Sequence, residues 1–138
     1  PDQLRIEITE TAYVENAELL IGTTEKLKEL GFSVEMDDFG SGYSSLHMLK
    51  EVPVDRLKLD LYFLTETGDA DKGRVIIDHV IQMGNALGIT MIAEGVENSA
   101  QAVSLYKIGC TCMQGFFFYK PMPVDRFEEV MEKNEQEA

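Results

Sequence analysis

Hydrophobic residues along the chain gather in short runs, and one arrangement of them occurs three times. Segments 30–34, 87–91 and 108–112 each contain an apolar residue, a glycine and then a short run with apolar positions. A glycine after an amphipathic stretch is typical of a helix C-terminus, because glycine enters the left-handed region without a Cβ clash. Each segment therefore predicts the end of a helix and the start of a strand.

Further elements follow from the remaining pattern. Two more strands are expected at Leu4–Ile8 and Arg56–Asp60, and a last helix after Pro123, whose fixed φ suits a first turn. Asp71 and Asn98 are the predicted N-caps of the second and third helices. The order β-α-β-(short α)-β-α-β-α-β-α predicts parallel strands joined by right-handed crossovers.

The number of these units points to a fold class. Five βα units in 138 residues average about 28 residues each, close to the roughly 31 of a (β/α)8 barrel of about 250 residues. The sequence therefore predicts an α/β fold that forms a partial (β/α)8, TIM-type barrel. Residues 132–138 are charged and are expected to form a frayed tail.

Charge narrows the classes of partner. With 12 Lys+Arg and 25 Asp+Glu, the formal net charge is −13. Nucleic acids and anionic lipids both need a field of basic residues, so no DNA binding is expected. No apolar run approaches the roughly 20 residues that cross a bilayer, which argues against membrane insertion. Cys110 and Cys112 are expected to be plain buried thiols, which fits a reducing, cytoplasmic location.

Acidic residues recur at the predicted ends of the strands. Because the C-terminal ends of parallel strands share one face of a sheet or barrel, these side chains should meet there. Crowded carboxylates repel one another unless a proton or a cation separates them, and hard divalent cations prefer oxygen ligands, so Mg²⁺ or Mn²⁺ is the expected occupant. The alternative is that they are ordinary exposed loop charges. The residues expected at this face are Glu7, Glu10, Asp37, Asp38, Lys58, Asp60, Glu94, Glu97 and Gln114.

Five motifs occur in an order and spacing that match a known family. They are 7–10 (Glu-Ile-Thr-Glu), 37–46 (Asp-Asp-Phe-Gly-Ser-Gly-Tyr-Ser-Ser-Leu), 57–60 (Leu-Lys-Leu-Asp), 93–97 (Ala-Glu-Gly-Val-Glu), and 114–115 (Gln-Gly) with 120–121 (Lys-Pro). With these motifs the chain resembles the EAL domains, cyclic di-GMP phosphodiesterases with a (β/α)8 barrel. The resemblance implies that residues 1–131 form the C-terminal part of such a domain, from its fourth strand to its eighth.

The resemblance also implies a role for each residue. Glu7, Asp37, Asp38 and Glu94 resemble metal ligands. Lys58 and Glu94 resemble the catalytic residues, with Lys58 positioning or activating the attacking water. Other matching positions would support these ligands or form the substrate loop, namely Glu10, Asp60, Glu97, Gln114, Phe39, Gly40, Ser41 and Gly42.

Several positions keep a structural interpretation. Glu10, Glu97 and Gln114 are also compatible with capping of neighbouring loops, and Phe39 and Tyr43 with packing. His47 has no acid or base partner in sequence and His79 lies in a predicted helix, so both are expected to be structural or at the surface. The run 116–119 (Phe-Phe-Phe-Tyr) is interpreted as strand exit and core.

Two departures from the family pattern affect the functional prediction. No Glu-Ala-Leu tripeptide occurs in the sequence, so the glutamate that names the family, and an asparagine ligand from the third strand, are missing. In addition, Asp60 is followed by Leu-Tyr-Phe, where family members usually carry a basic and then a small residue. Because Mg²⁺ demands near-octahedral geometry, the loss of two ligands should weaken its binding.

Two functions are therefore compatible with the sequence. The chain is a portion of a metal-dependent phosphodiesterase that hydrolyses cyclic di-GMP to linear pGpG in the complete domain, and is expected to be inactive alone. The alternative is an inactive truncated EAL module that binds nucleotide or a partner protein. Self-association is expected through exposed strand edges or the loop 39–45.

Overall fold

The chain folds into alternating strands and helices. The computed structural model describes residues 1, 4–39, 45–61 and 70–137. The elements are β1 (Arg5–Thr9), α1 (Glu10–Glu15), α2 (Ala17–Glu29), β2 (Ser33–Asp37), α3 (Ser45–Glu51), β3 (Arg56–Asp60), α5 (Ala70–Ala86), β4 (Thr90–Glu94), α6 (Ser99–Lys107), β5 (Cys112–Met113) and α7 (Val124–Glu137).

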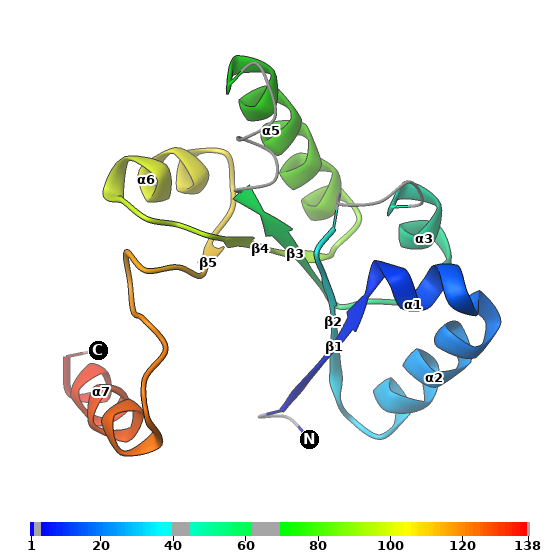
Figure 1. Ribbon diagram of the computed structural model, residues 1–138, viewed down its shortest axis with the longest axis horizontal. Helices are drawn as coiled ribbons and strands as arrows, with labels where there is room; N and C mark the ends of the chain where they lie inside the picture. The colour runs from blue at the N-terminus through cyan, green and yellow to red at the C-terminus, as the bar shows by residue number, and fades with distance from the viewer. Residues whose placement is uncertain (2–3, 40–44, 62–69, 138) are drawn as a thin grey trace.

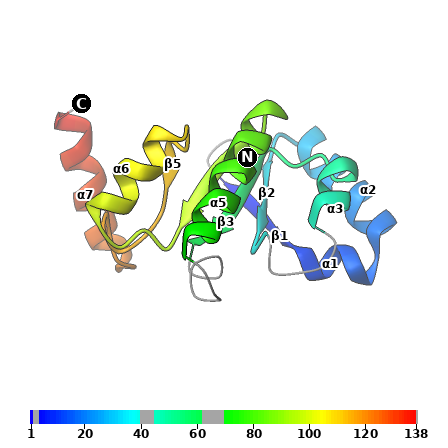
Figure 2. The same ribbon diagram turned by 90° about the horizontal axis from the view of Figure 1, so that it is seen from above.

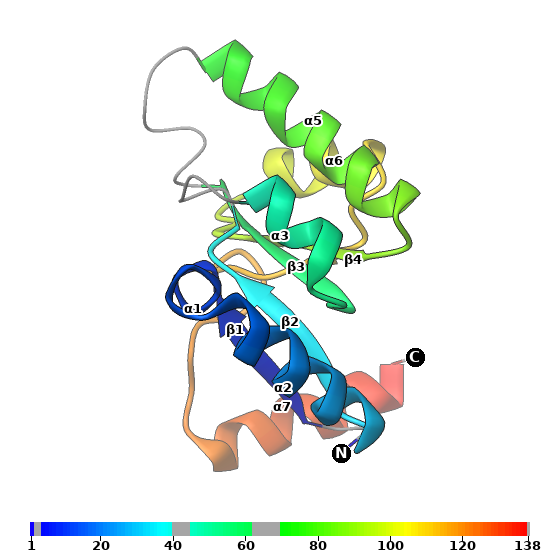
Figure 3. The ribbon, with the colours of Figure 1, turned by 90° about the vertical axis from the view of Figure 1, so that its right-hand side faces the viewer.

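The strands form one parallel sheet in the order of the sequence, β1-β2-β3-β4-β5. This confirms the predicted α/β fold with parallel strands. Figures 1 and 2 show α2, α3, α5 and α6 distributed along the sheet, whereas α7 lies apart at the β5 end, after an extended segment. The side view in Figure 3 shows α3, α5 and α6 on the same side of β3 and β4.

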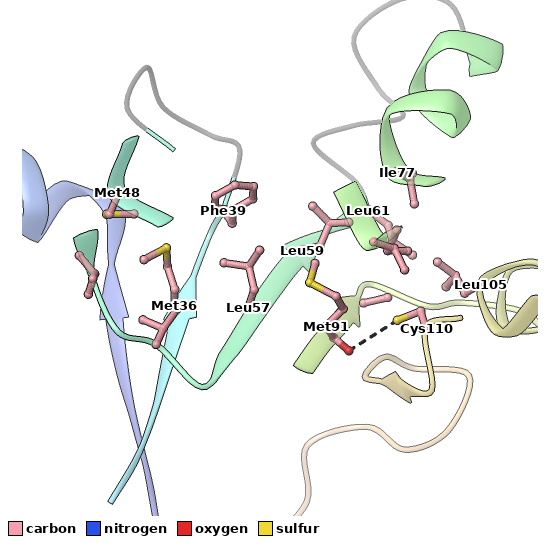
Figure 4. Close-up of a cluster of buried hydrophobic side chains, with 14 of the residues drawn as sticks. Met36, Phe39, Met48, Leu57, Leu59, Leu61, Ile77, Met91, Leu105 and Cys110 are labelled. Atoms are coloured by element: carbon pink, nitrogen blue, oxygen red, sulfur yellow. Dashed lines mark hydrogen bonds between the residues drawn. The ribbon is translucent and has the colours of Figure 1, made fainter. Parts of the chain in front are cut away.

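The core lies between the sheet and these helices. Val34 and Met36 of β2 are fully buried, as is Leu57 of β3. Figure 4 shows Met36 and Leu57 in the same cluster as Met48 of α3. Because side chains alternate along a strand, the residues between these apolar positions point to the other face of the sheet. That second face carries the charged residues.

The residue after Asp60 belongs to this core. Leu61 is 5% exposed and lies in the cluster with Ile77 of α5 (Figure 4). The departure from the family pattern at this position thus has a packing role. The two residues that follow, Tyr62 and Phe63, lie outside the described residues.

Helix ends agree with the sequence in most respects. The glycines of the three repeated segments have positive φ, as a helix C-terminus requires. Asn98 caps α6, because its side chain accepts a hydrogen bond from the N–H of Gln101 while the Gln101 side chain accepts one from the N–H of Asn98. Asp71 is not an N-cap, since α5 already begins at Ala70 and Asp71 lies in its first turn. Asn16, which the sequence analysis overlooked, caps α2.

Two predictions about strand ends were wrong. Glu10 does not finish the first strand but begins α1, where it is buried. The run from Phe116 to Tyr119 does not enter the core, since these four side chains are 42–62% exposed. The reason is that β5 stops at Met113 and the chain then turns, with the N–H of Phe117 donating to the carbonyl of Val96.

Candidate functional site

Three carboxylates converge on one lysine at the charged face of the sheet. Lys58 Nζ lies 2.9 Å from Glu7 Oε1, 2.9 Å from Glu94 Oε1 and 3.1 Å from Asp37 Oδ1. The lysine side chain is 8% exposed, against 18% for Glu94, 24% for Asp37 and 52% for Glu7. We refer to these four residues as the Lys58 cluster.

Strand pairing explains why residues so far apart in the chain meet. Asp60 pairs with Glu94 in the ladder between β3 and β4, and Thr9 pairs with Asp37 between β1 and β2. Asp37 and Glu94 are thus the last residues of their strands, and both lie at the C-terminal edge of the sheet. The predicted meeting of strand-end acids is therefore present, with Lys58 at its centre.

The environment of the lysine keeps it charged. Burial by itself would lower the pKa of Lys58, but the ion pairs with Glu7, Glu94 and Asp37 outweigh burial and raise that pKa well above its usual range. Lys58 is therefore a permanent cation at neutral pH, able to donate hydrogen bonds and not to accept a proton.

For Glu94, another member of the Lys58 cluster, burial outweighs the effect of the ion pair on the pKa. Burial raises the pKa of Glu94, assisted by the negative charges of Asp37 and Glu7, while Lys58 partly opposes the shift. Glu94 is consequently a better proton acceptor than an exposed glutamate.

The donor atoms of the cluster suit a hard divalent cation. Asp37 Oδ1 is buried and, although it lies near Lys58 Nζ, it accepts no hydrogen bond of good geometry from the residues described. Its lone pairs are thus available to a ligand, and carboxylate oxygens are what Mg²⁺ and Mn²⁺ prefer. Among the residues that the structure describes, no group of three or more Asp, Glu, His or Cys side chains is arranged so that it could hold a metal ion. The residues fit a cation by chemistry, without forming a complete coordination sphere.

Other predicted site residues near β2 and β3 have different surroundings. Asp38 is exposed and takes a left-handed backbone conformation with φ of 55°. Phe39 is buried in the apolar core, and its N–H donates to the carbonyl of Lys58, which connects the end of β2 to β3. Asp60 is half-buried. The loop positions Gly40, Ser41, Gly42 and Tyr43 lie outside the described residues.

The remaining acids and Gln114 are spread along the same edge. Glu10 is 5% exposed at the start of α1. Glu97 is exposed, and its backbone N–H donates to Gln101 Oε1. Gln114 is exposed too, and its backbone links β4 to the turn after it, since its N–H donates to Ala93 and its carbonyl accepts from Val96. Among the described residues, the ion pairs of Lys58 are with Glu7, Asp37 and Glu94. A role for Glu10, Glu97 and Gln114 in the site stays a prediction.

The histidines lie at the surface, as expected, although one has a partner that the sequence did not indicate. His79 is exposed on α5, and its Nδ1 lies 2.8 Å from the carbonyl of Val75. His47 Nε2 lies 3.4 Å from Glu51 Oε1, one helical turn along α3, so the absence of an acidic partner was a wrong prediction. The same glutamate accepts a hydrogen bond from the hydroxyl of Tyr13.

A second charged group was missed by the sequence analysis. Glu35 Oε1 lies 3.2 Å from Arg5 Nε and 3.6 Å from Arg56 Nε. We refer to these three residues as the Glu35 cluster. Each lies two residues before a member of the Lys58 cluster on the same strand, a spacing that the alternation of a strand could have indicated.

Comparison with known proteins decides the family. The EAL domain family matches residues 1–121 of the chain. The chain belongs to the EAL domain family. The five strands are therefore part of a TIM-barrel-like EAL domain, as the sequence predicts.

Individual EAL proteins agree with this assignment. The cyclic di-GMP phosphodiesterase RocR of Pseudomonas aeruginosa is 37% identical over 127 residues, which are 92% of this chain and 32% of RocR. The EAL domain of Mycobacterium smegmatis DcpA superposes with a TM-score of 0.87 at 37% identity, over 96% of this chain and 59% of that chain. Klebsiella pneumoniae BlrP1, solved in complex with calcium and cyclic di-GMP, gives a TM-score of 0.74 at 33% identity, over 84% of this chain and 29% of that chain.

The chain corresponds to only part of each of these relatives. The chain spans less than a third of the length of the curated relatives that it matches.

Within the described part of the chain, no helix is both long and apolar enough to cross a membrane.

Proposed function

We propose that this chain forms the part of a cyclic di-GMP phosphodiesterase domain that supplies its central lysine and most of its metal-binding carboxylates. The observation that carries the proposal is the convergence of Glu7, Asp37 and Glu94 on Lys58 at the C-terminal edge of a parallel sheet. Active sites of TIM barrels lie at this edge. The match to RocR supports cyclic di-GMP as substrate.

The reaction would hydrolyse one phosphodiester of cyclic di-GMP to give linear pGpG. A water oxygen bonds to phosphorus as the bond from phosphorus to one ribose oxygen breaks. A carboxylate takes up one proton of the water, and the departing ribose oxygen receives a proton from solvent and becomes a hydroxyl. Lys58, held as a cation, stabilises negative charge on the phosphate oxygens and orients the water. Glu94 is the carboxylate best suited to accept the proton, because burial raises its pKa.

We further propose Glu7, Asp37, Asp38 and Glu94 as the residues that would hold Mg²⁺ or Mn²⁺. The calcium found with cyclic di-GMP in BlrP1 supports a divalent cation at such a site. When bound, the cation would lower the pKa of a coordinated water and neutralise charge on the phosphate. Glu10, Asp60, Glu97 and Gln114 would support these ligands from the same edge. The two free cysteines agree with a cytoplasmic location.

The proposal predicts that this chain can replace its counterpart in an active enzyme. In a hybrid of RocR that carries this chain in place of the matching segment, we expect hydrolysis of cyclic di-GMP with Mg²⁺ or Mn²⁺. Lys58→Met in the hybrid should lower the rate at least about 100-fold, the size of effect typical of a lost catalytic group. Chromatography of the linear product provides the measurement.

A control keeps the result interpretable. Lys28→Met removes a lysine that also forms an ion pair, with Asp55 at 2.7 Å, but lies outside the Lys58 cluster. The hybrid with this change should keep its activity. A folded hybrid that retains full activity without Lys58 would contradict the proposed role.

The second candidate function is a module that binds nucleotide or a partner without hydrolysis. The absence of a ready metal site among the residues described favours it. Calorimetry separates the two functions: binding of cyclic di-GMP by the folded hybrid with no turnover would establish the module and contradict the enzyme.

Exposed apolar side chains lead us to predict that the chain self-associates. β1 and β5 are the end strands of the sheet, and Phe116 and Phe127 are more than half exposed. Strand edges and apolar patches of this kind promote pairing between chains. Light scattering after size exclusion at micromolar concentration should give the mass of a dimer or larger species. A stable monomer would contradict the prediction.

A further inference from the structure

The Glu35 cluster lies beside the Lys58 cluster, on three of the four strands that carry it. Arg5 and Glu7 are two residues apart on β1, Glu35 and Asp37 on β2, and Arg56 and Lys58 on β3. Residues two apart on a strand point to the same face and are separated by roughly 6.6 Å along it. Each strand thus contributes one residue to each cluster.

Burial distinguishes Glu35 from the acids of the site. Its side chain is 7% exposed, and its Oε1 accepts no hydrogen bond of good geometry from any residue that the structure describes. A buried carboxylate needs compensation, and here the nearby charges are the guanidinium groups of Arg5 and Arg56. Glu35 therefore links β1 and β3, the strands on either side of its own.

Such a link has a geometric effect that exceeds its effect on stability. The desolvation of a buried ion pair offsets most of its Coulomb attraction, so apolar side chains of similar volume often stabilise a fold as well. An apolar side chain at position 35 would not attract the guanidinium groups of Arg5 and Arg56, however, and would leave β1 and β3 freer to shift relative to β2. The ion pairs of Glu35 thus connect β1, β2 and β3 two residues before the members of the Lys58 cluster.

We propose that Glu35 is a positioning residue for the Lys58 cluster. By bridging Arg5 and Arg56, Glu35 holds Glu7 and Lys58 at their distances from each other and from Asp37. The expected effect of Glu35 on cation binding rests on the proposed function. Its expected effect on the distances between Lys58 and the carboxylates does not.

Two variants of the chain test this inference. Glu35→Gln keeps the shape of the side chain and removes its charge. The triple variant Arg5→Met, Glu35→Leu, Arg56→Met fills the same space with apolar side chains, and keeps the test decisive if Glu35→Gln alone does not fold. Ile81→Val is the matched control, because Ile81 of α5 is fully buried on the helix side and the change lowers stability without touching the charged face.

The readout is the ammonium group of Lys58, followed by proton–nitrogen correlation spectra of the lysine side chains. Ammonium protons that are fixed in ion pairs exchange slowly with water and give a resolved signal. We expect the Lys58 signal in the unmodified chain and in Ile81→Val, and its loss in Glu35→Gln and in the triple variant. Calorimetry should show Mn²⁺ binding at least tenfold weaker in the same two variants.

The outcomes separate this inference from the proposed function. An unchanged Lys58 signal in the triple variant would overturn the positioning role, as would its loss in Ile81→Val. An unmodified chain that shows the Lys58 signal but binds no Mn²⁺ would count against the proposed function alone, and the signal would still decide the role of Glu35.

Discussion

Replacing Lys58 with methionine is expected to lower the free energy of unfolding at pH 7 by about 3 kcal/mol, the lower end of the range for a buried ion pair that loses one partner. The lower end applies because Glu7, one of its three partners, is half-exposed and remains solvated. Methionine keeps the length of the apolar stem, so the loss reports the charge. Urea denaturation of the chain and of the variant provides the measurement.

The deficit of Lys58→Met should shrink as the pH is lowered from 7 to 5. Lys58 itself does not titrate between pH 7 and 5, because its pKa is raised in the folded chain and its unfolded value is about 10.5. The change with pH therefore comes from its acidic partners. The pKa of Glu94 is already raised by burial, and without the ammonium it rises further. An acid whose folded pKa is raised stabilises the fold at low pH, and this stability is lost as the pH rises through that pKa.

Lys28→Met is the matched control for this experiment. Lys28 pairs with Asp55, but both side chains are about one-third exposed, so the change should cost about 0–1 kcal/mol. If the loss of free energy of unfolding in Lys58→Met stayed constant or grew at pH 5, the loss would not come from the missing charge beside the carboxylates.

Gly115→Ala is expected to destabilise the chain by about 3 kcal/mol, the upper end of the usual range for overpacking. A Cβ at Gly115 would lie 2.1 Å from the carbonyl oxygen and 2.4 Å from the nitrogen of Val96. Neither is a flexible side-chain atom, so the two segments must separate. The hydrogen bonds from Val96 to Gln114 and from Phe117 to Val96 would be strained or lost.

Gly22→Ala is expected to change the stability in the opposite direction to Gly115→Ala. Gly22 lies within α2, and a Cβ there would meet no atom within 4 Å. Alanine should therefore stabilise the chain by about 0.5–1 kcal/mol through its higher helix propensity. Thermal unfolding of both variants gives the comparison. Equal stability of Gly115→Ala and the unmodified chain would show that the contact with Val96 is not as close as described.

Much of the fold could be predicted from local pattern. Glycines after amphipathic stretches indicated where helices end, and Arg56–Asp60 was predicted with the bounds that the structure shows. The prediction was wrong at Phe116–Tyr119, where apolar composition suggested core. Composition cannot show that β5 has only two residues, because a strand's length depends on pairing with a neighbour.

The candidate site, like the fold, could be predicted from the sequence only in part. The meeting of strand-end acids followed from the parallel order, since the C-terminal ends of parallel strands share one edge. The partners of Lys58 did not follow, because the lysine and Glu7 are 51 residues apart and their contact depends on register and rotamer. The alternation of each strand could have indicated that the Glu35 cluster shares a face with the Lys58 cluster, but the burial of Glu35 and its contacts with the two arginines depend on strand packing.

The sequence by itself therefore determined the order of the elements, their parallel direction and the edge of the sheet at which acidic residues gather, because these depend on backbone preferences and on the alternation of side chains. Only the tertiary structure decided which charges touch. It placed Lys58 among three carboxylates and Glu35 between two arginines, since such contacts depend on how strands from distant parts of the chain pack side by side.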